Sequence, residues 1–236
     1  MKFYRDITIV FAYYMNPSML TRHYDLFREL PLKFKQHLKL IVVDDGSPEP
    51  IQEAKRHVGL PIELYRVGVD VRWNQDACRN IGVHHVKTEW VLLTDIDHLI
   101  PQATLEKILT IKLDRAQVYK FSRVSLPDLE PYKPHPNSWL MTKDMYERIG
   151  GYDERFAGYY GTDADFRNRV AKQATMVTLG CHLIRVPREV VPDASTTTYE
   201  RKTPEDKEAI PRIRAARSQE ADPRPKRLTF PYSRVA

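Results

Sequence analysis

The chain has 236 residues, of which 42% are hydrophobic, 10% aromatic and 29% charged. These values are ordinary for a soluble globular protein and exclude wholesale disorder and collagen-like structure, while the length suits one α/β domain with an appended tail. Two cysteines, Cys78 and Cys181, are too few for a disulfide framework or a Cys-based zinc site, so we expect a reducing compartment.

Neither a membrane helix nor a secretion signal is predicted. The best apolar stretch, Ile7 to Met15, is much shorter than the roughly 18–20 residues that a membrane helix needs. Asp6 interrupts the apolar region that a signal peptide would require near the N-terminus. We therefore expect a cytoplasmic protein without a transmembrane segment.

The formal net charge of +6 is concentrated at the C-terminal end. Residues 201–236 hold ten Lys or Arg against five Asp or Glu, whereas residues 1–200 carry a surplus of only one positive charge. Such a segment could bind nucleic acid, anionic lipid or an acidic partner, or it could be a solvated extension. We expect a main domain over residues 1–200 and a basic, proline-containing tail over residues 201–236.

In residues 1–130, apolar runs of strand length alternate with amphipathic stretches of helix length, which predicts a mostly parallel sheet covered by helices. The predicted strands are Ile7–Tyr13, Leu38–Val43, Ile62–Val67, Trp90–Thr94 and Val118–Val124. The predicted helices are a first one capped by Ser18 and ended by Pro31, then Glu49–His57, Gln75–Val86 and Pro101–Leu113.

A second half follows a proline-rich stretch, Pro127 to Pro136, that predicts an irregular loop. The elements expected after it are a strand at Trp139–Thr142, helices at Lys143–Ile149 and Thr162–Lys172, and a last strand at Met176–Val186. Beyond Tyr199 the sequence is polar and only weakly helical, typical of a tail.

Two acidic clusters stand where predicted strands end. Asp44 and Asp45 follow the second strand, and Asp95 and Asp97 follow the fourth. In open parallel sheets the ligand site lies at the carboxyl ends of the strands, and a D-x-D pair there can bind a divalent cation and a ribose hydroxyl. About one D-x-D arises by chance in a chain of this length, and aspartates also form turns and helix caps.

The order of the remaining motifs separates these alternatives. WNQDACRNIG precedes the D-x-D strand, and LIP follows it at residues 99–101. GGYDERF comes at residues 150–156 and GYYGTDADF at residues 158–166. This series resembles that of family-two glycosyltransferases of the GT-A fold over about residues 5–186, and the second half has some likeness to the β-galactosyltransferases.

The resemblance implies a GT-A, Rossmann-like α/β domain with a nucleotide-binding half over about residues 1–125 and an acceptor half over about residues 126–200. In this family Asp44, with Asp45 beside it, would accept from the nucleotide base. Arg79 would lie near the diphosphate or the base, and Asp95 near the ribose. Asp97 would bind the divalent metal, Mn²⁺ or Mg²⁺.

The resemblance further implies that Asp163 is the catalytic base of an inverting, in-line transfer of one sugar from a nucleotide sugar, typically a UDP-sugar. Thr162 stands where the family often has Glu, and it could instead cap the following helix. The third metal ligand would be a histidine after the last strand, for which His182 is the candidate, although a lone strand histidine is more often a packed or solvent-facing residue. His98 is a further candidate of low weight.

Other functions remain open at this point. A nucleotidyltransferase would need a Gly-rich phosphate loop, which Phe11 to Pro17 does not offer. The Q-x-x-R-W motif of processive synthases is absent, which favours single-sugar transfer. A catalytically silent module that binds sugar or nucleic acid is the alternative, and the acceptor could be a glycan, a small molecule or modified nucleic acid.

Overall fold

The computed structural model describes residues 2–51, 58–196 and 200–235. Its strands are β1 (Ile7–Tyr13), β2 (Leu38–Asp44), β3 (Ile62–Val67), β4 (Trp90–Leu93), β5 (His98–Leu99), β6 (Gln117–Ser125), β7 (Glu130–Tyr132), β8 (Trp139–Thr142), β9 (Thr175–Arg185) and β10 (Tyr232–Arg234). Its helices are α1 (Pro17–Glu29), α2 (Leu32–Lys35), α3 (Gln75–His85), α4 (Gln102–Thr110), α5 (Lys143–Ile149), the 3-10 helix η1 (Glu154–Phe156), α6 (Asp163–Gln173) and α7 (Pro204–Gln219). None of the helices in these ranges has both the length and the apolar character needed to cross a bilayer.

All described strands belong to one sheet, in the order β10-β3-β2-β1-β4-β8-β6-β9-β5, with β7 paired to β6. Strands β3, β2, β1 and β4 are mutually parallel, which confirms the predicted α/β architecture. Beyond β4 the sheet is mixed, because β8 is antiparallel to both its neighbours while β9 is parallel to β6. The carboxyl ends of β1, β2 and β4 therefore meet at one edge, where a ligand site is expected.

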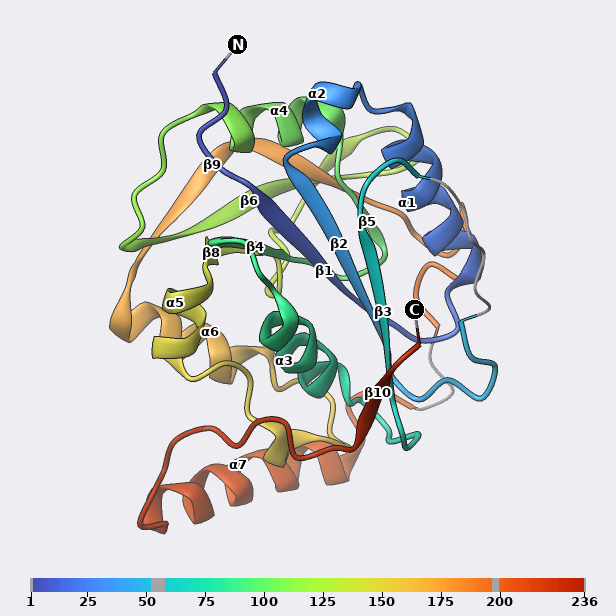
Figure 1. The fold of residues 1–236 in the computed structure, drawn as a ribbon. Coiled ribbons are helices and arrows are strands. Elements are labelled where there is room, and N and C mark those ends of the chain that lie inside the picture. The colour runs from blue at the N-terminus through green and yellow to red at the C-terminus, as the bar shows by residue number, and fades with distance from the viewer. Residues whose placement is uncertain (1, 52–57, 197–199, 236) are drawn as a thin grey trace.

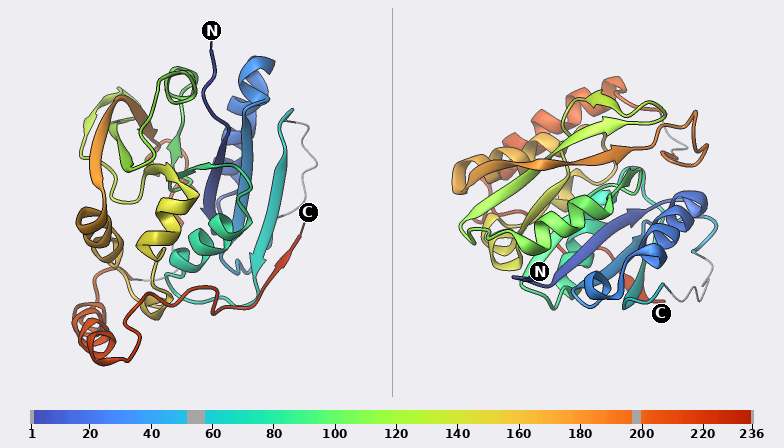
Figure 2. Two further views of the ribbon diagram at one scale, coloured as in Figure 1. Left: turned by 60° about the vertical axis from the view of Figure 1, so that its left-hand side comes forward. Right: turned by 90° about the horizontal axis from the view of Figure 1, so that it is seen from above.

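Alternating side chains of β1 divide the core between the two faces of the sheet. Ile9 and Phe11 pack with the apolar residues of α1, α2 and α4 on one face. Val10 and Ala12 pack with those of α3, α5 and α6 on the other. Figure 2 shows the resulting layers, with helices on both sides of the twisted sheet.

The predicted elements up to residue 186 agree closely with the structure, with a few local errors. Asn16, rather than Ser18, is the residue before α1, and the carboxylate of Asp193 accepts from the backbone N–H groups of Ser18 and Met19. The proline-rich stretch contains the short strand β7. Most of the helix predicted at Glu49–His57 lies outside the described residues.

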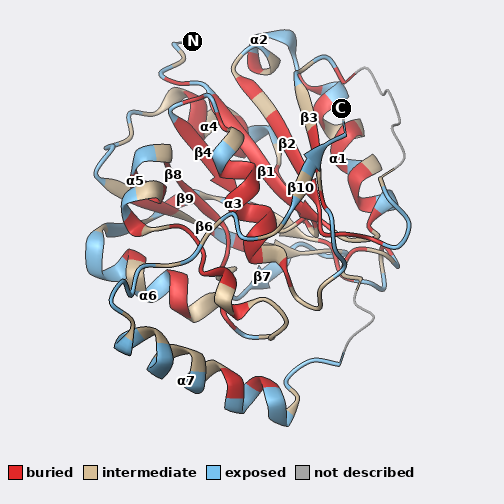
Figure 3. Ribbon diagram, turned by 60° about the horizontal axis from the view of Figure 1, so that its bottom comes forward, coloured by how far each residue is buried: buried red, intermediate tan, exposed pale blue. Residues whose placement is uncertain are grey.

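The prediction of a tail after residue 200 is wrong. These residues form α7, which lies across the bottom of the molecule in Figure 1, and β10, which pairs antiparallel with β3 at the sheet edge. Figure 3 shows that α7 is mostly exposed with a few buried positions, so its sequence carries little hydrophobic pattern. Polar contacts dock this segment instead.

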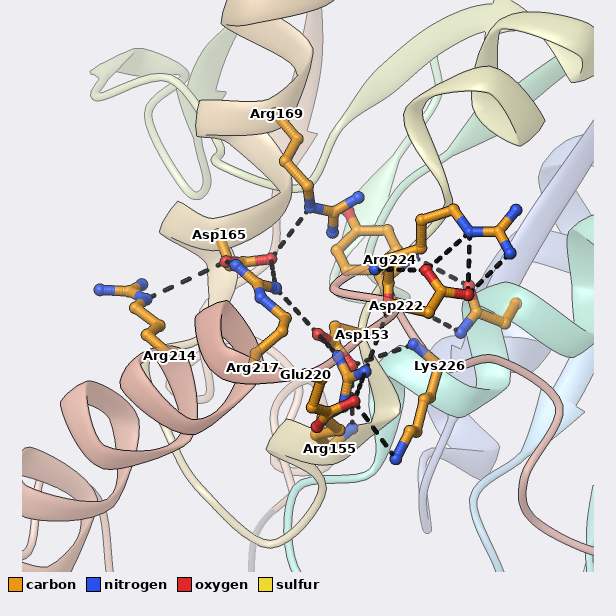
Figure 4. A network of polar contacts seen from close by, with 12 residues as sticks. Asp153, Arg155, Asp165, Arg169, Arg214, Arg217, Glu220, Asp222, Arg224 and Lys226 are labelled. Carbon is orange, nitrogen blue, oxygen red and sulfur yellow. Dashed lines mark hydrogen bonds and ion pairs between the residues drawn. The ribbon is translucent and has the colours of Figure 1, made fainter.

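Charged side chains join α7 to the main domain. Arg217 donates to Asp153 and to both carboxylate oxygens of Asp165, at 2.8 to 3.1 Å. Figure 4 shows this network together with the neighbouring pair of Arg155 and Glu220. Because both aspartates are buried, loss of the C-terminal segment would leave their charges without Arg217.

At the start of α7, Asp206 joins the segment to the loop before α3. Its side chain is 1% exposed and takes a two-pronged contact from Arg72 at 2.8 and 2.9 Å. Asp206 also accepts from the backbone N–H groups of Thr203 and Tyr160, so it completes the capping box of α7 and holds the 159–161 loop.

His23 joins α1 to the loop after β4. The imidazole is fully buried between Phe11 and Phe27, and its Nε2 lies 2.8 Å from the carbonyl oxygen of Ile96, the middle residue of the D-x-D sequence. A carbonyl only accepts, so Nε2 carries the proton. Burial lowers the pKa of His23 to about 4, so the ring is neutral at pH 7.

We expect Asp206→Ala to lower the free energy of unfolding by about 2–4 kcal/mol, because it leaves Arg72 and two backbone donors without their buried acceptor. Glu208→Ala, at an exposed position of the same helix, is the control and should change it by less than about 0.5 kcal/mol. Urea unfolding curves measure both values. Equal unfolding midpoints for the two variants would contradict this role of Asp206.

We expect acid to destabilise the protein partly through His23. The unfolded chain binds a proton at this residue near pH 6.5, whereas the folded chain does so only near pH 4, so stability is full above pH 6.5 and falls as the pH drops to 4. This difference corresponds to on the order of 3 kcal/mol. In urea unfolding at stepped pH, His23→Gln should flatten this slope and the exposed-site control His182→Gln should not. An unchanged slope in His23→Gln would refute the assignment.

Candidate active site

A cavity of about 630 Å³ opens at the carboxyl edge of the parallel strands. Its walls come from the end of β1, the start of α3, the loop after β4, the β6–β7 region, the loop before α6 and the segment after β9. Asp95, Asp97, Arg79 and Asp163 all line it, so four of the predicted site residues are brought together.

Asp95 is held by two basic groups. Its Oδ1 lies 2.6 Å from Nη2 of Arg79, and its Oδ2 lies 3.2 Å from Nε2 of His135. Burial alone would raise the pKa of Asp95, but the charges of His135 and Arg79 outweigh it and hold the pKa below the ordinary value. Asp95 is therefore ionised, with both carboxylate oxygens engaged.

Arg79 is 3% exposed and serves more than one acid. Besides Asp95, its guanidinium contacts Asp76 at 3.0 Å and the side-chain oxygen of Gln75 at 2.9 Å, and it lies over the ring of Tyr152. The charge of Arg79 therefore compensates the negative charges of Asp76 and Asp95 in the cavity wall.

Asp97 faces the cavity with 21% of its side chain exposed. Its Oδ1 lies 2.7 Å from Nδ1 of His98, and its carbonyl oxygen accepts from the backbone of Val186. Arg123 donates to Nε2 of His98, which puts the proton of the neutral ring on Nδ1, toward Asp97. Burial lowers the pKa of His98, in keeping with a neutral ring. His98 therefore orients Asp97 and is not itself open to the cavity.

Asp163 begins α6 at the cavity wall, and Asn137 donates to its Oδ1 at 2.7 Å. The oxygen of Asn137 in turn accepts from the buried Tyr152, so the amide has a fixed orientation. Thr162 does not cap α6 as predicted, because its hydroxyl donates to Asp76 at 3.1 Å. Burial raises the pKa of Asp76 to about 6, although Arg79 opposes the shift.

The structure does not bring Asp44 and Asp45 to the cavity, since neither carboxylate lines it. Asp44 accepts from the backbone of Ser47 and Ile51 and pairs with Arg66 at 3.2 Å, so it organises its own turn. Asp45 is buried against Cys78, and burial raises the pKa of its carboxyl well above the ordinary value. In this structure Asp44 supports its own turn, and the contact of Asp44 and Asp45 with a nucleotide base stays a prediction.

His182 is also absent from the cavity lining, so the structure does not bring this candidate metal ligand to Asp97. It is an exposed residue within β9, paired in register with Ser122, three residues before the strand reaches the cavity at Arg185. The position at the cavity after this strand is Val186.

Sequence reasoning missed several residues of the site. His135 and Asn137 lie at the end of the proline-rich stretch and contact Asp95 and Asp163 directly. The only sequence signal for them was the presence of a histidine and an asparagine beside several prolines, in a segment predicted to be an irregular loop. Tyr159 and Tyr160 also line the cavity, where their rings could stack on a sugar, whereas the nearby Trp139 and Tyr152 are core residues.

The donor set indicates how a divalent cation could be held. No group of three or more His, Cys, Asp or Glu side chains in residues 2–51, 58–196 and 200–235 is arranged around a common point. Both aspartates are about one-fifth exposed and line the cavity, but both oxygens of Asp95 contact basic groups, whereas Asp97 has only Oδ1 against His98 and keeps its second oxygen for a cation. This set fits an ion that shares its ligands with a diphosphate and water, as Mg²⁺ commonly does.

Three comparisons relate this site to known proteins. The family model described as glycosyltransferase like family 2 matches residues 23–129. No curated protein sequence matches the chain at a significant level. The structural matches below have at most 15% identity, so they speak for the fold.

Residues 1–349 of S. aureus TarS with UDP-GlcNAc match with a TM-score of 0.67 and 15% identity, covering 92% of this chain and 67% of that one. Another structure of the same TarS fragment matches with a TM-score of 0.62 and 14% identity, covering 80% of this chain and 63% of that one. Mannosyltransferase PcManGT from Pyrobaculum calidifontis, with GDP-Man and Mn²⁺, matches with a TM-score of 0.58 and 15% identity, over 77% of this chain and 56% of that one. GalNAc-T7 with UDP, GalNAc and Mn²⁺ matches with a TM-score of 0.60 and 11% identity, over 78% and 44%.

The chain thus spans about two thirds or less of the length of these proteins. Strand order, the cavity at the carboxyl edge and the family match over residues 23–129 agree with one another. The chain has the GT-A fold, and its resemblance to the family-two glycosyltransferases is confirmed.

Proposed function

We propose that the protein is an inverting, non-processive glycosyltransferase that moves one sugar from a nucleotide sugar, preferentially a UDP-sugar, to an acceptor hydroxyl. The observation that carries this proposal is the position of Asp97 and Asp163 on the walls of one cavity at the carboxyl edge of the sheet. The carboxylate of Asp97 suits a cation-bound diphosphate, and that of Asp163 suits proton removal from the acceptor.

The donor would lie along the nucleotide-binding half. The base would occupy the end of the cavity bordered by Tyr13, Tyr14 and Trp73, whose rings suit a planar heterocycle. The ribose would approach the loop of Asp95, and the diphosphate would extend toward Asp97. A divalent ion at Asp97, Mn²⁺ or Mg²⁺, would neutralise the charge that develops on the departing diphosphate.

The acceptor hydroxyl would approach from the side of Asp163. The carboxylate takes the hydroxyl proton as that oxygen forms a bond to the anomeric carbon, and the electron pair of the old bond leaves with the diphosphate. Because attack and departure occur on opposite faces, the configuration inverts. Asn137, 2.7 Å from Asp163, holds the carboxylate toward the cavity for this step.

The buried amide network argues against a decayed, silent module. Asn137 is 3% exposed and bridges Tyr152 and Asp163, so the orientation of Asp163 is fixed by the core. Thr162, the departure from the family pattern, is engaged with Asp76 on the inner side and leaves Asp163 at the cavity.

We expect UDP to raise the melting temperature in the presence of Mn²⁺ and to do so much less without it, because the ion and the diphosphate share ligands. Asp97→Asn should weaken Mn²⁺-dependent UDP binding by 10-fold or more, while Asp128→Asn, an exposed control, should leave it unchanged. Thermal-shift titrations with UDP, GDP and each metal measure this. The same UDP response with and without metal in the unaltered protein would exclude the role of Asp97.

We expect Asp163→Asn to lower sugar transfer by about 10²–10⁴-fold, the usual contribution of a general base. Because Asp163 would not touch the nucleotide, the UDP dissociation constant should stay within twofold. Release of UDP from a panel of nucleotide sugars, with water as the acceptor, measures turnover before an acceptor is known. Retention of full activity by Asp163→Asn would exclude it as the base, and no turnover by the unaltered protein would favour the silent binding module.

A further inference from the structure

Four cations gather on the wall of the cavity formed by β6, β7 and β9. We call Arg123, Lys133, Arg185 and Arg188 the basic cluster; all four line the cavity. Arg123 is 7% exposed, so this group is partly built into the fold rather than spread on the surface.

None of the four side chains forms a salt bridge with a carboxylate among the described residues, although the more distant charges of Asp97 and Asp95 act on Arg123. Arg123 donates to the carbonyl of Lys133 and to His98, Arg185 donates to the hydroxyl of Ser125, and Arg188 donates to the carbonyl of Ser195. These acceptors are neutral. Of the other two buried arginines in the described residues, Arg79 pairs with Asp76 and Asp95, whereas Arg5, which does not line the cavity, donates to the backbone carbonyls of Ile108 and Ile111.

Two members of the cluster, Arg123 and Arg185, contact the ring of the same tyrosine. The guanidinium of Arg123 lies 4.7 Å from the centre of the Tyr132 ring, and that of Arg185 lies 4.9 Å from it. Burial lowers the pKa of Arg123 and the charge of Arg185 adds to the effect, while the carboxylates of Asp97 and Asp95 oppose it. The ring face attracts each cation, whereas the two like charges repel each other, so an anion bound beside them would relieve the repulsion.

The position of the cluster separates it from the nucleotide end of the cavity. Lys133, Arg185 and Arg188 belong to the acceptor half, and Arg123 lies on β6 at the very end of the nucleotide-binding half. The nucleotide end of the cavity is built by the end of β1 and the start of α3. Arg123 contacts His98, which in turn contacts Asp97, so the cluster adjoins the expected reaction centre.

We infer that the basic cluster binds an anionic group, a phosphate or a carboxylate, on the acceptor. This inference rests on the proposed function. Guanidinium groups recognise both anions through paired hydrogen bonds, and the ring of Tyr132 keeps the two arginines in place. The acceptor class is therefore a phosphorylated or carboxylated hydroxyl compound, rather than a neutral sugar.

The test is isothermal titration of the UDP- and Mn²⁺-saturated protein, in which the diphosphate site is already filled, with glucose 6-phosphate and with glucose as probes. We expect the phosphate to bind at least 10-fold more tightly than glucose. Arg185→Gln and the exposed Lys133→Gln should each weaken that binding at least 5-fold, with UDP affinity kept within twofold. Arg212→Gln on the outer surface of α7 is the matched control.

Equal binding of the two probes, or no effect of either variant, would overturn the inference while leaving UDP binding, and hence the proposed function, intact. Weaker UDP binding in both variants would assign the cluster to the donor diphosphate and would overturn the acceptor role. If the unaltered protein did not bind UDP at all, the proposed function would fail, and this inference with it.

Discussion

The site depends on how a folded chain keeps several carboxylates together at one edge of a sheet. Without a cation between them, Asp76 and Asp95 would repel each other and would lose hydration without compensation. Arg79 lies between them, fully charged and 3% exposed, and satisfies both. Arg79 and His135 together keep Asp95 ionised and hold both of its oxygens, while the neighbouring Asp97 faces the same cavity with one oxygen against His98.

The motifs that carry the resemblance to family-two glycosyltransferases are, in this structure, mainly architectural. Asn80 of the WNQDACRNIG motif donates to the carbonyl of Tyr152 and to Glu154, and accepts from the backbone of Tyr152, so it ties this motif to GGYDERF. A Cβ on Gly82 would lie 2.3 Å from Val10, which explains the glycine where α3 crosses β1. Gly151 has a φ of +63° and lies against the same Asn80.

These contacts explain what the sequence could predict. Strand bounds such as Ile7–Tyr13 and Trp139–Thr142 were exact because apolar runs record burial directly. Helix α7 was missed because ion pairs dock it, and charges that serve docking look the same in a sequence as charges that face water. The turn contacts of Asp44 could not be predicted for a related reason: a strand-end aspartate that caps its own turn and one that faces a ligand have the same spacing.

The distribution of charge in space differs from its distribution along the chain. Part of the basic surplus of residues 201–236 is paired with the main domain, because Arg217 pairs with Asp165 and Arg227 pairs with Glu147. Arg123 and Arg185, which form no salt bridge with a carboxylate among the described residues, line the cavity. Most of the cations at the cavity therefore come from residues 1–200, whose net charge is close to zero, so it is the fold and not the overall composition that concentrates positive charge there.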